Sequence, residues 1–521
     1  MNNTLIRALE NPAVYPHPAE AVQRVETHIS WVLLTGTHAY KIKKPMDFGF
    51  LNFTTLEARR YYCEEEVRLN RRTAPELYEC IVSFCGTPES PVIHEGIRDD
   101  AFEYGIRMKQ FRPDEVLDEV PIDHPDMPRW MDELADTLAA LHASASVADG
   151  SVSFGDPDEV WAPVQQNFEQ ISPLLQDDQE RRRLENIAAW ARDTFERLAP
   201  LMAGRKARGF VRECHGDVHL GNVACVDNHI RLFDCIEFNE SFRWTDTWCD
   251  LAFLLMDLED RGRDDLASRV LNRYLEQTGD YEGLQLLAFY KSYRAMVRCK
   301  IALLTLANPE LGPDSRRELE VRYTNYIELA ERYMQLPKRF CIAMCGLSGS
   351  GKSTVSGELL ETMHAIRIRS DVERKRLFGL SPRDNSQAAG KNIYTPEATQ
   401  RTYDRVAELA GQVLDCGYPV IADATYLRRA ERATIEQVAE DRAVPFVLVR
   451  CTAPEALIEK WLTERKARGE DPAEADVDVF RKQKTAMEAL SEEENRHCLS
   501  VDTQDLKAIH VLAERLGVQF G

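Results

Sequence analysis

The 521-residue sequence has no uninterrupted apolar run near the roughly 18 residues that a membrane-spanning helix needs, so we expect no transmembrane segment. Its first residues, Met1 to Arg7, do not combine a basic start with an apolar stretch, and no signal peptide is predicted. Internal repeats and low-complexity segments are also missing. We therefore expect a cytoplasmic globular protein that does not bind membranes.

Positive charge is in deficit, because 65 Lys and Arg residues face 86 Asp and Glu residues, which gives a formal net charge of −21. Sequence-independent binding to nucleic acid depends on Lys and Arg side chains that neutralise phosphates. We do not expect nucleic acid as a partner, although a local basic patch would still permit one.

Cysteine is present, but in a pattern that disfavours a disulfide framework. The 13 cysteines are odd in number and scattered, and several lie within apolar runs. Buried free thiols are therefore the expectation, rather than disulfides or a metal cage.

The length is too great for one ordinary core and indicates two to four domains. A richly charged helical pattern ends near Pro337-Lys338, and we place the main boundary there. The predicted domains are residues 1–337 and 338–521. The oligomeric state is not predicted.

One stretch has the pattern of a phosphate-binding loop. An apolar strand candidate, Cys341 to Cys345, runs into a glycine-rich turn and then a helix-compatible segment, Val355 to Met363. The glycines let backbone N–H groups converge on an anion at a helix N-terminus, where the helix dipole favours negative charge. Lysine then contacts the β- and γ-phosphates, and the following serine ligates Mg²⁺. The predicted nucleotide contacts are Gly346, Ser348, Gly349, Ser350, Gly351, Lys352, Ser353 and Thr354, with Ser353 also a metal ligand.

Two further apolar segments after this loop end in a carboxylate. The strand predicted over 365–371 ends at Asp371, which would act as a base toward an acceptor hydroxyl, and Arg374 would hold an anionic acceptor. The strand predicted over 418–423 ends at Asp423, the expected Mg²⁺-linked partner of Ser353. The alternative for Asp423 is a helix N-cap.

The N-terminal segment predicts a β-hairpin made of residues 28–34 and 38–43. Period two places Lys41 and Lys43 on one face. The helix predicted over 56–72 carries Glu64, Glu65 and Glu66, so a lysine–glutamate ion pair is available. The alternative is a solvated charged face.

A second group of chemical residues lies between positions 213 and 252. Asp217 and Asn222 are spaced like the Asp and Asn of a kinase catalytic loop, in which the Asp accepts the hydroxyl proton and the Asn ligates Mg²⁺. Asp234 ends a short apolar strand and would be the second metal ligand. A zinc pair of His215 and His219 is the alternative, but Gly216 and Gly221 disfavour the helix that it needs.

Three motifs in this group, His215-Gly-Asp-x-His-x-x-Asn222, Phe233-Asp234 and Asp250-Leu-Ala252, resemble the aminoglycoside phosphotransferase family of the protein-kinase-like fold. The resemblance implies a bilobal kinase with an adenine hinge at residues 108–111. Protein substrates are disfavoured, because a G-x-G-x-x-G loop is missing and Cys-Ile-Glu follows Asp234. The implied roles are Lys41 as strand lysine, Glu66 as its helix partner, Asp217 as base, and Asn222 and Asp234 as Mg²⁺ ligands.

Residues 338–521 resemble the small P-loop kinases, which include gluconate and shikimate kinases, polynucleotide 5′-kinases and zeta-toxin-like kinases. This resemblance implies that Arg465 and Arg468, on a helix predicted over 457–468, belong to a mobile lid that closes on phosphates. On the residues alone, a solvated helix face explains these arginines as well. The order of the two domains resembles bacterial proteins described as bifunctional phosphotransferase/AAA-family ATPases.

The predicted fold class is therefore α/β and α+β, with a bilobal protein-kinase-like domain followed by a P-loop NTPase domain that has a parallel sheet flanked by helices. The predicted function is an ATP- and Mg²⁺-dependent phosphotransferase with two nucleotide sites and small-molecule hydroxyl acceptors. The alternative makes the C-terminal domain a polynucleotide or nucleotide-sugar kinase and the N-terminal domain a regulatory nucleotide-binding module.

Overall fold

The structure is a computed structural model that describes residues 2–49, 51–309, 311–386, 388–468 and 472–520. The chain folds into two compact units, one made of Met1–Asp257 and Tyr293–Glu320, the other of Leu258–Ser292 and Val321–Gly521. The boundary that the sequence predicts at residues 337 and 338 stays a prediction. Within the described ranges, no helix has both the length and the apolar character that a membrane crossing requires.

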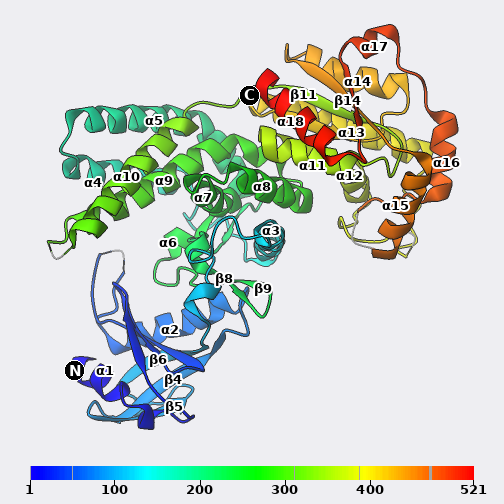
Figure 1. Ribbon diagram of the computed structural model, residues 1–521. Helices are drawn as coiled ribbons and strands as arrows, with labels where there is room; N and C mark the ends of the chain where they lie inside the picture. Colours follow the sequence, from blue (N-terminus) through cyan, green and yellow to red (C-terminus); the bar gives the residue numbers. More distant parts are fainter. Residues whose placement is uncertain (1, 50, 310, 387, 469–471, 521) are drawn as a thin grey trace. The chain divides into compact units, whose positions relative to one another are not determined.

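After a short N-terminal helix, the first unit has a six-stranded antiparallel sheet in the order β1-β2-β3-β6-β4-β5. Figure 1 labels β4, β5 and β6 of this sheet. The predicted hairpin is confirmed, because β2 and β3 pair with Leu34 opposite Ala39. Side chains alternate between the two faces of the sheet, and each face has its own apolar core. The strands are β1 (Gln23–Glu26), β2 (Ser30–Leu34), β3 (His38–Lys43), β4 (Tyr78–Thr87), β5 (Ser90–Glu95) and β6 (Glu103–Lys109).

Helix α2 (Leu56–Asn70) packs against β4 and β6 of this sheet. It begins where the Thr55 side chain accepts a hydrogen bond from the N–H of Ala58, which satisfies one of the N-terminal donors of the helix. Its inward face carries Cys63, Glu66 and Val67. A carboxylate on an apolar face needs a buried cation, and β3 supplies it.

The remainder of the first unit is mainly helical, with two short antiparallel strand pairs, β7 with β10 and β8 with β9. These pairs carry the loops of the candidate site. Helices α7, α9 and α10 each pass from one unit into the other. The elements are α1 (Asn2–Leu9), η1 (Pro12–Val14), η2 (Pro113–Glu115), α3 (Met127–Ser144), α4 (Pro157–Ile171), η3 (Ser172–Leu174), α5 (Asp178–Ala207), β7 (Val211–Glu213), η4 (Leu220–Asn222), β8 (Val223–Val226), β9 (His229–Leu232), α6 (Glu240–Arg243), β10 (Trp244–Asp246), α7 (Thr247–Asp260), α9 (Leu284–Leu306) and α10 (Pro313–Tyr333).

The second unit has a five-stranded parallel sheet in the order β12-β13-β11-β14-β15. Its central strand, β11, is buried along its whole length, as expected when helices cover both faces of a parallel sheet. The predicted fold class is confirmed. The strands are β11 (Cys341–Cys345), β12 (Ile366–Arg369), β13 (Val420–Asp423), β14 (Phe446–Thr452) and β15 (Cys498–Asp502).

Helices α11, α18 and α8 form one group against this sheet, whereas α13 and α14 contact β12, β13, β11 and β14. Helices α15 and α16 contact each other, and their apolar residues pack with Leu347 of the phosphate-binding loop. The elements are α8 (Asp264–Thr278), η5 (Tyr281–Gly283), α11 (Lys352–Met363), α12 (Ser370–Leu377), α13 (Pro396–Asp415), α14 (Arg429–Glu440), α15 (Glu455–Arg468), α16 (Val477–Ala486), α17 (Glu492–Arg496) and α18 (Leu506–Phe520).

Helix α8 is built into the second unit although it lies far upstream of the phosphate-binding loop. Its Asn272 accepts the N–H of Arg367 at 2.6 Å and donates to the carbonyl of Ala365 at 3.0 Å, so the side chain pairs with edge strand β12 like a neighbouring strand. Glu276 accepts from Arg367 at 2.7 Å. This unit therefore includes a segment that the sequence pattern assigns to the N-terminal domain.

All 13 cysteines are free thiols, and ten of them are buried. Burial raises the pKa of several of these thiols, Cys341 to about 12 for example, so they stay protonated at neutral pH. The expectation of buried free thiols is confirmed.

Candidate functional site

The first candidate site begins with an ion pair between β3 and α2. Lys41 Nζ lies 2.8 Å from Glu66 Oε1, and it also donates to Asp234 Oδ1 at 2.6 Å. Lys43, two residues on and on the same face, donates to the other oxygen of Glu66 at 2.6 Å. The predicted lysine–glutamate pair is therefore present, and the solvated-face alternative is wrong for Glu66, whose side chain is fully buried.

The two lysines differ in their access to solvent. The side chain of Lys41 is 12% exposed, whereas that of Lys43 is 0% exposed. Burial opposes ionisation of Glu66, but the two ammonium groups lower its pKa to about 2. Burial likewise lowers the pKa of Lys41, yet the carboxylates of Asp234 and Glu66 raise it well above its usual value. Lys41 is the lysine that lies beside the predicted metal ligand.

The loop that carries Asp217 is held by two buried carboxylates of α7, Asp250 and Asp257. Asp250 accepts the N–H groups of His215 and Gly216, each at 2.7 Å, with one oxygen for each. Two helical turns further along α7, Asp257 accepts the N–H of Leu220 at 2.9 Å. These bonds fix the backbone on both sides of Asp217.

Asp217 and Asn222 are brought together as the motif spacing predicts. Asn222 Nδ2 donates to the carbonyl of Asp217 at 2.9 Å and to its Oδ2 at 3.0 Å. His219 Nδ1 lies 3.1 Å from the N–H of Gly221 and accepts it, which leaves the ring proton on Nε2, 3.3 Å from Asp217 Oδ2. Both contacts fall on the same oxygen of Asp217. His219 is a positioning residue in this geometry, and the residues 215–219 are not helical, so the zinc-pair alternative lacks its scaffold.

The acidity of Asp217 follows from these neighbours. Burial would raise its pKa, but His219 and then His215 lower it, to about 2. The group is therefore ionised at neutral pH, as an acceptor of a hydroxyl proton must be.

Asp234 follows β9 in a left-handed backbone conformation with φ 61°, which is unfavourable for a residue other than glycine. Tyr78 Oη accepts the N–H of Asp234 at 3.2 Å, and Asn70 Oδ1 accepts the N–H of Cys235 at 2.8 Å. These two bonds from β4 and α2 hold the turn. Asn222 Oδ1 and the Asp234 carboxylate are the oxygens that suit Mg²⁺, and their metal roles stay predictions.

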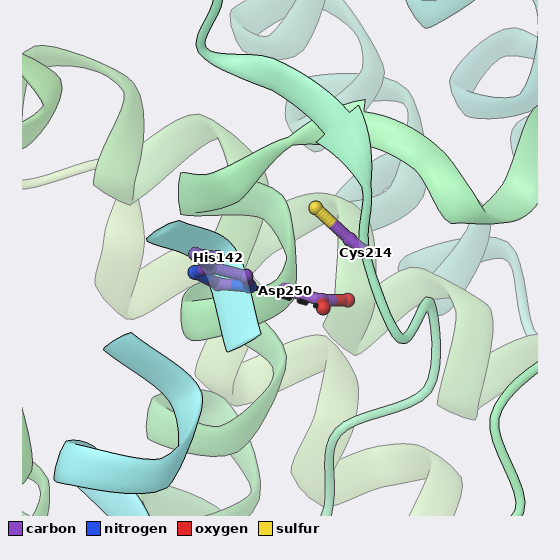
Figure 2. A group of neighbouring side chains, drawn as sticks. All are labelled: His142, Cys214 and Asp250. Atoms are coloured by element: carbon purple, nitrogen blue, oxygen red, sulfur yellow. Dashed lines mark hydrogen bonds and ion pairs between the residues drawn. The ribbon is translucent and has the colours of Figure 1, made fainter. Parts of the chain in front are cut away.

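His142, Cys214 and Asp250 form another group of metal-type side chains, with ligand atoms within 4.8 Å of one another (Figure 2). Both oxygens of Asp250 already accept backbone N–H groups, and His142 Nε2 lies 3.3 Å from one of them. Burial raises the pKa of Cys214 well above its usual value, so it is a thiol rather than a thiolate ligand. We assign this cluster to the anchoring of the loop before Asp217.

The second candidate site is the loop between β11 and α11. Gly346, Gly349 and Gly351 have φ values of 147°, 80° and 81°, so the predicted glycine-dependent backbone is present. A Cβ at Gly346 would lie 2.6 Å from the carbonyl oxygen of Cys451, and one at Gly351 would lie 2.7 Å from Thr503 Cβ. The loop thus requires glycine for packing as well as for conformation.

Lys352 begins α11 and folds back over this loop, where its Nζ donates to the carbonyls of Gly346 at 3.0 Å and Leu347 at 2.9 Å. Burial lowers its pKa, although Asp423 and Asp371 both lie near enough to oppose that shift. Within the described residues, Ser350 Oγ is buried and has no hydrogen-bond partner. An ammonium group bonded only to carbonyls and an unpartnered hydroxyl fit a loop that receives phosphate oxygens.

The other predicted contacts of this loop are placed as follows. The N–H of Ser348 donates to Gln483 Oε1 of α16 at 2.8 Å. Ser353 and Thr354 lie in the first turn of α11. Asp423 ends β13, as predicted, and accepts a hydrogen bond from Ser356 Oγ at 2.8 Å. The N-cap alternative for Asp423 is wrong, because α14 begins only at Arg429. The metal roles of Ser353 and Asp423 stay predictions.

The sequence predicts Asp371 at the end of a strand, and this prediction is wrong. Strand β12 ends at Arg369, and Asp371 lies in the first turn of α12, where a carboxylate suits the N-terminal end of the helix. Arg374, one turn on, is 7% exposed and donates to the carbonyl of Ile393 at 3.1 Å, while its buried Nε has no partner in the described structure. Its predicted acceptor-binding role is untested.

The predicted lid arginines lie at the end of α15. Arg465 donates to the carbonyl of Ala475 at 2.6 Å, so it spans the connection between α15 and α16. Arg468 is the last residue of α15, and its side chain lies outside the described residues. Their nucleotide-binding roles stay predictions.

Sequence reasoning missed several contributors to these sites. Asp257 could have been found from its position seven residues after Asp250, which places both on one face of a helix. Period two places Lys43 on the face of Lys41, but the sequence gives no sign of its second partner, Glu237. Gln483 and His142 gave no local signal, because their contacts depend on distant segments.

Two family models match the chain. Residues 60–287 match the phosphotransferase enzyme family, and this region includes Glu66, Asp217, Asn222 and Asp234. Residues 341–490 match an AAA domain, and this region includes the whole phosphate-binding loop.

Relatives and solved structures extend the comparison. An uncharacterised protein of Mycobacterium tuberculosis is 29% identical over 468 residues, which cover 87% of this chain and 88% of that protein. The structure of a choline/ethanolamine kinase family protein from Mesorhizobium loti covers 64% of this chain and 97% of its own, with a TM-score of 0.40 and 14% identity. A gluconokinase from Sinorhizobium meliloti covers 36% and 99%, with a TM-score of 0.26 and 18% identity.

The two family matches fall on the two sites that the geometry delineates. The chain therefore combines a protein-kinase-like phosphotransferase region with a P-loop kinase-like region, and it is an enzyme of the phosphotransferase class.

Proposed function

We propose that the protein is an ATP- and Mg²⁺-dependent kinase with two nucleotide sites, each of which transfers the γ-phosphoryl group of ATP to a hydroxyl group of a small molecule. The observation that carries the proposal is the shared contact of Asn222 and His219 with one oxygen of Asp217. This contact leaves Asp217 Oδ1 as the oxygen that accepts the acceptor's proton. In the transfer, the hydroxyl oxygen bonds to the γ-phosphorus, the bond from that phosphorus to the ADP oxygen breaks, and the hydroxyl proton passes to Asp217.

At the first site, the chain supplies one cation and two metal-type ligands near Asp217. Asn222 donates its amide N–H to Asp217, so its Oδ1 would be the atom that binds Mg²⁺. Asp234 offers a half-exposed carboxylate beside Lys41. Mg²⁺, when bound, offsets the charge of the phosphate oxygens. Lys41, kept charged by Glu66, would bind a phosphate oxygen.

At the second site, the chain's contribution is a cradle and a lysine. The left-handed glycines and the first turn of α11 direct backbone N–H groups at an anion, and Lys352 lies over the loop. Asp423 accepts a hydrogen bond from Ser356, which lies three residues after Ser353 in α11, and Asp423 would hold a metal together with Ser353. Asp371 lies close enough to affect the Lys352 ammonium and would accept the proton of the second acceptor.

Small molecules are favoured over nucleic acid as acceptors of the second site because its basic residues are used inside the protein. Lys375 is 2% exposed and lies 3.3 Å from Glu474 Oε1. Arg376 donates to the carbonyl of Glu276 at 2.6 Å and pairs with Glu373. A nucleic-acid end kinase would need such residues at the surface to neutralise a phosphate backbone.

The proposal is tested by ATP-dependent phosphorylation of a metabolite library, with the full chain and two variants that disable one site each. Lys352→Ala removes the phosphate-binding cation of the second site, and Asp217→Asn removes the base of the first. We expect each variant to lose phosphorylation of one set of acceptors and to retain the other. A phosphorylated acceptor that both single variants still produce at the wild-type rate would contradict the assignment of these residues.

A further inference from the structure

A second lysine, Lys43, is enclosed in the first unit next to the predicted nucleotide lysine. Its side chain is 0% exposed, and its Nζ lies 4.9 Å from the centre of the Phe53 ring. An ammonium group is rarely buried to this extent unless carboxylates surround it, because leaving water costs several kcal/mol. Its carboxylate partners are Glu66 and Glu237.

Lys43 extends the Lys41 ion pair into a chain of five charged groups. In order, the contacts run from Asp234 to Lys41 at 2.6 Å, from Lys41 to Glu66 at 2.8 Å, from Glu66 to Lys43 at 2.6 Å, and from Lys43 to Glu237. Glu66 thus has one lysine on each carboxylate oxygen. At one end of these five charged groups, the side chain of Asp234 is 45% exposed, and at the other end the side chain of Glu237 is 4% exposed.

Glu237 lies three residues after Asp234 in a segment that is fixed to the catalytic loop. The N–H of Ile236 donates to the carbonyl of His215 at 3.1 Å, and the carbonyl of Glu237 accepts from Arg243 at 3.1 Å. The Lys43–Glu237 pair therefore ties strand β3 and helix α2 to the segment that carries Asp234.

We propose that Lys43 and Glu237 are positioning residues that keep Glu66 in place when Lys41 exchanges its contact with Asp234 for a nucleotide phosphate. This inference rests on the proposed function, since it requires that the first site binds Mg·ATP. A Mg²⁺ ion on the Asp234 carboxylate would repel the Lys41 ammonium, which lies 2.6 Å from Asp234 Oδ1, and would favour the turn of Lys41 from Asp234 to a phosphate oxygen. Lys43 has no such competing role, because it is enclosed and both of its carboxylate partners are internal.

The charge balance explains why one lysine would not suffice. Three carboxylates and two ammonium groups form the chain, so the removal of Lys43 leaves Glu66 and Glu237 facing each other with one lysine for three acids. Like charges at short range disfavour the ionised pair, and Glu66 would then turn away or compete with phosphate for Lys41. Either result weakens nucleotide binding at the first site.

The test uses the full chain in a Lys352→Ala background, so that calorimetry of Mg·ATP binding reports the first site. We expect Lys43→Met to weaken Mg·ATP binding about tenfold, which corresponds to about 1.4 kcal/mol. Glu237→Gln, which keeps the size of the side chain, should weaken it about threefold or more. The double variant should be no weaker than Lys43→Met, because both changes remove the same support of Glu66. Lys44→Met is the matched control, since Lys44 pairs with Glu26 at 2.7 Å and lies outside the chain of five.

The melting temperature is measured beside the affinity for Mg·ATP. If Lys43 had a merely structural role, its replacement would lower the melting temperature and leave the affinity unchanged. If the parent does not bind Mg·ATP, or if Asp234→Ala binds it as tightly as the parent, the proposed function fails. If the parent binds and Lys43→Met binds within twofold of it, the inference alone is overturned. If Lys43→Met does not fold, Glu237→Gln decides: a threefold loss supports the inference, and an affinity within twofold of the parent overturns it.

Discussion

Lys41 Nζ and Asp234 Oδ1 lie 2.6 Å apart, and this contact joins the strand lysine of the first site directly to its predicted metal ligand. The two residues are 193 positions apart in the sequence, and their contact joins strand β3 to the segment that follows β9. Because a Mg²⁺ ion on Asp234 would repel the Lys41 ammonium, nucleotide binding is expected to open this contact while Glu66 stays in place.

Asp217→Asn should separate chemistry from binding at the first site. In the Lys352→Ala background, we expect turnover on the acceptor found by the screen to fall by about 10²- to 10⁴-fold, because the group that takes the hydroxyl proton is lost. Mg·ATP affinity should stay within about twofold, because Asn222 and Asp234 are unchanged. Asp227→Asn, at an exposed aspartate of the same unit, is the control. Full turnover by Asp217→Asn would show that this loop is structural.

The local parts of both sites follow from the sequence because their signals are short. The strand–glycine turn–helix pattern predicts β11 and the loop after it, and period two places Lys41 and Lys43 on one face. The Asp217–Asn222 spacing predicts their contact for the same reason. Pairings across long separations could not be predicted, and so the sequence alone could not show that both lysines contact Glu66 or that Lys43 also pairs with Glu237.

Glu276→Gln should destabilise the second unit. Glu276 is the carboxylate partner of two arginines of edge strand β12, Arg367 at 2.7 Å and Arg369 at 3.7 Å. Glutamine keeps the volume but removes the charged carboxylate from these largely buried guanidinium groups, which costs about 3 kcal/mol. Scanning calorimetry of the full chain should show a lower melting temperature for one transition.

That transition is assigned to the second unit by its response to Mg·ATP, which Lys352→Ala should remove. Glu408→Gln, at an exposed glutamate of α13 that pairs with Arg405, is the matched control and should leave the transition unchanged. A transition that Glu276→Gln does not move would mean that the contacts of α8 with β12 contribute little to stability.

The place of α8 also shows where sequence reasoning ends. Asn272 and Glu276 lie in an ordinary helical pattern, and their partners follow almost a hundred residues later. Asp371 illustrates a different failure, because the apolar alternation before it continues into Ser370 and Asp371 with no turn residue to mark the end of β12. Helix α12 begins there directly, and only the packing of the unit decides between strand and helix.

Acid should destabilise the second unit through Glu494. Burial would raise the pKa of this carboxyl, but Arg432, which donates to it at 2.5 Å, lowers it to about 2. Because the folded pKa lies below the usual unfolded value of about 4.3, the pair contributes stability above that value and loses it as the pH falls from about 4.5 to 2. The contribution is on the order of 2 kcal/mol.

Denaturant unfolding between pH 2.5 and 6 checks this prediction. Glu494→Gln should lower stability at pH 6 and flatten its decline with acid, whereas Glu493→Gln, at the exposed neighbour in α17, should preserve the wild-type slope. An equal slope for Glu494→Gln and the wild type would assign the acid sensitivity to other carboxylates.

The number of Mg·ATP molecules bound per chain tests the central claim of two nucleotide sites most directly. Equilibrium dialysis of the full chain should give two for the wild type, one for Lys352→Ala, one for Asp234→Ala, and none for the double variant, because each change removes a phosphate or metal contact of a different site. A wild-type stoichiometry of one, or a stoichiometry that stays at two in both single variants, would contradict the account.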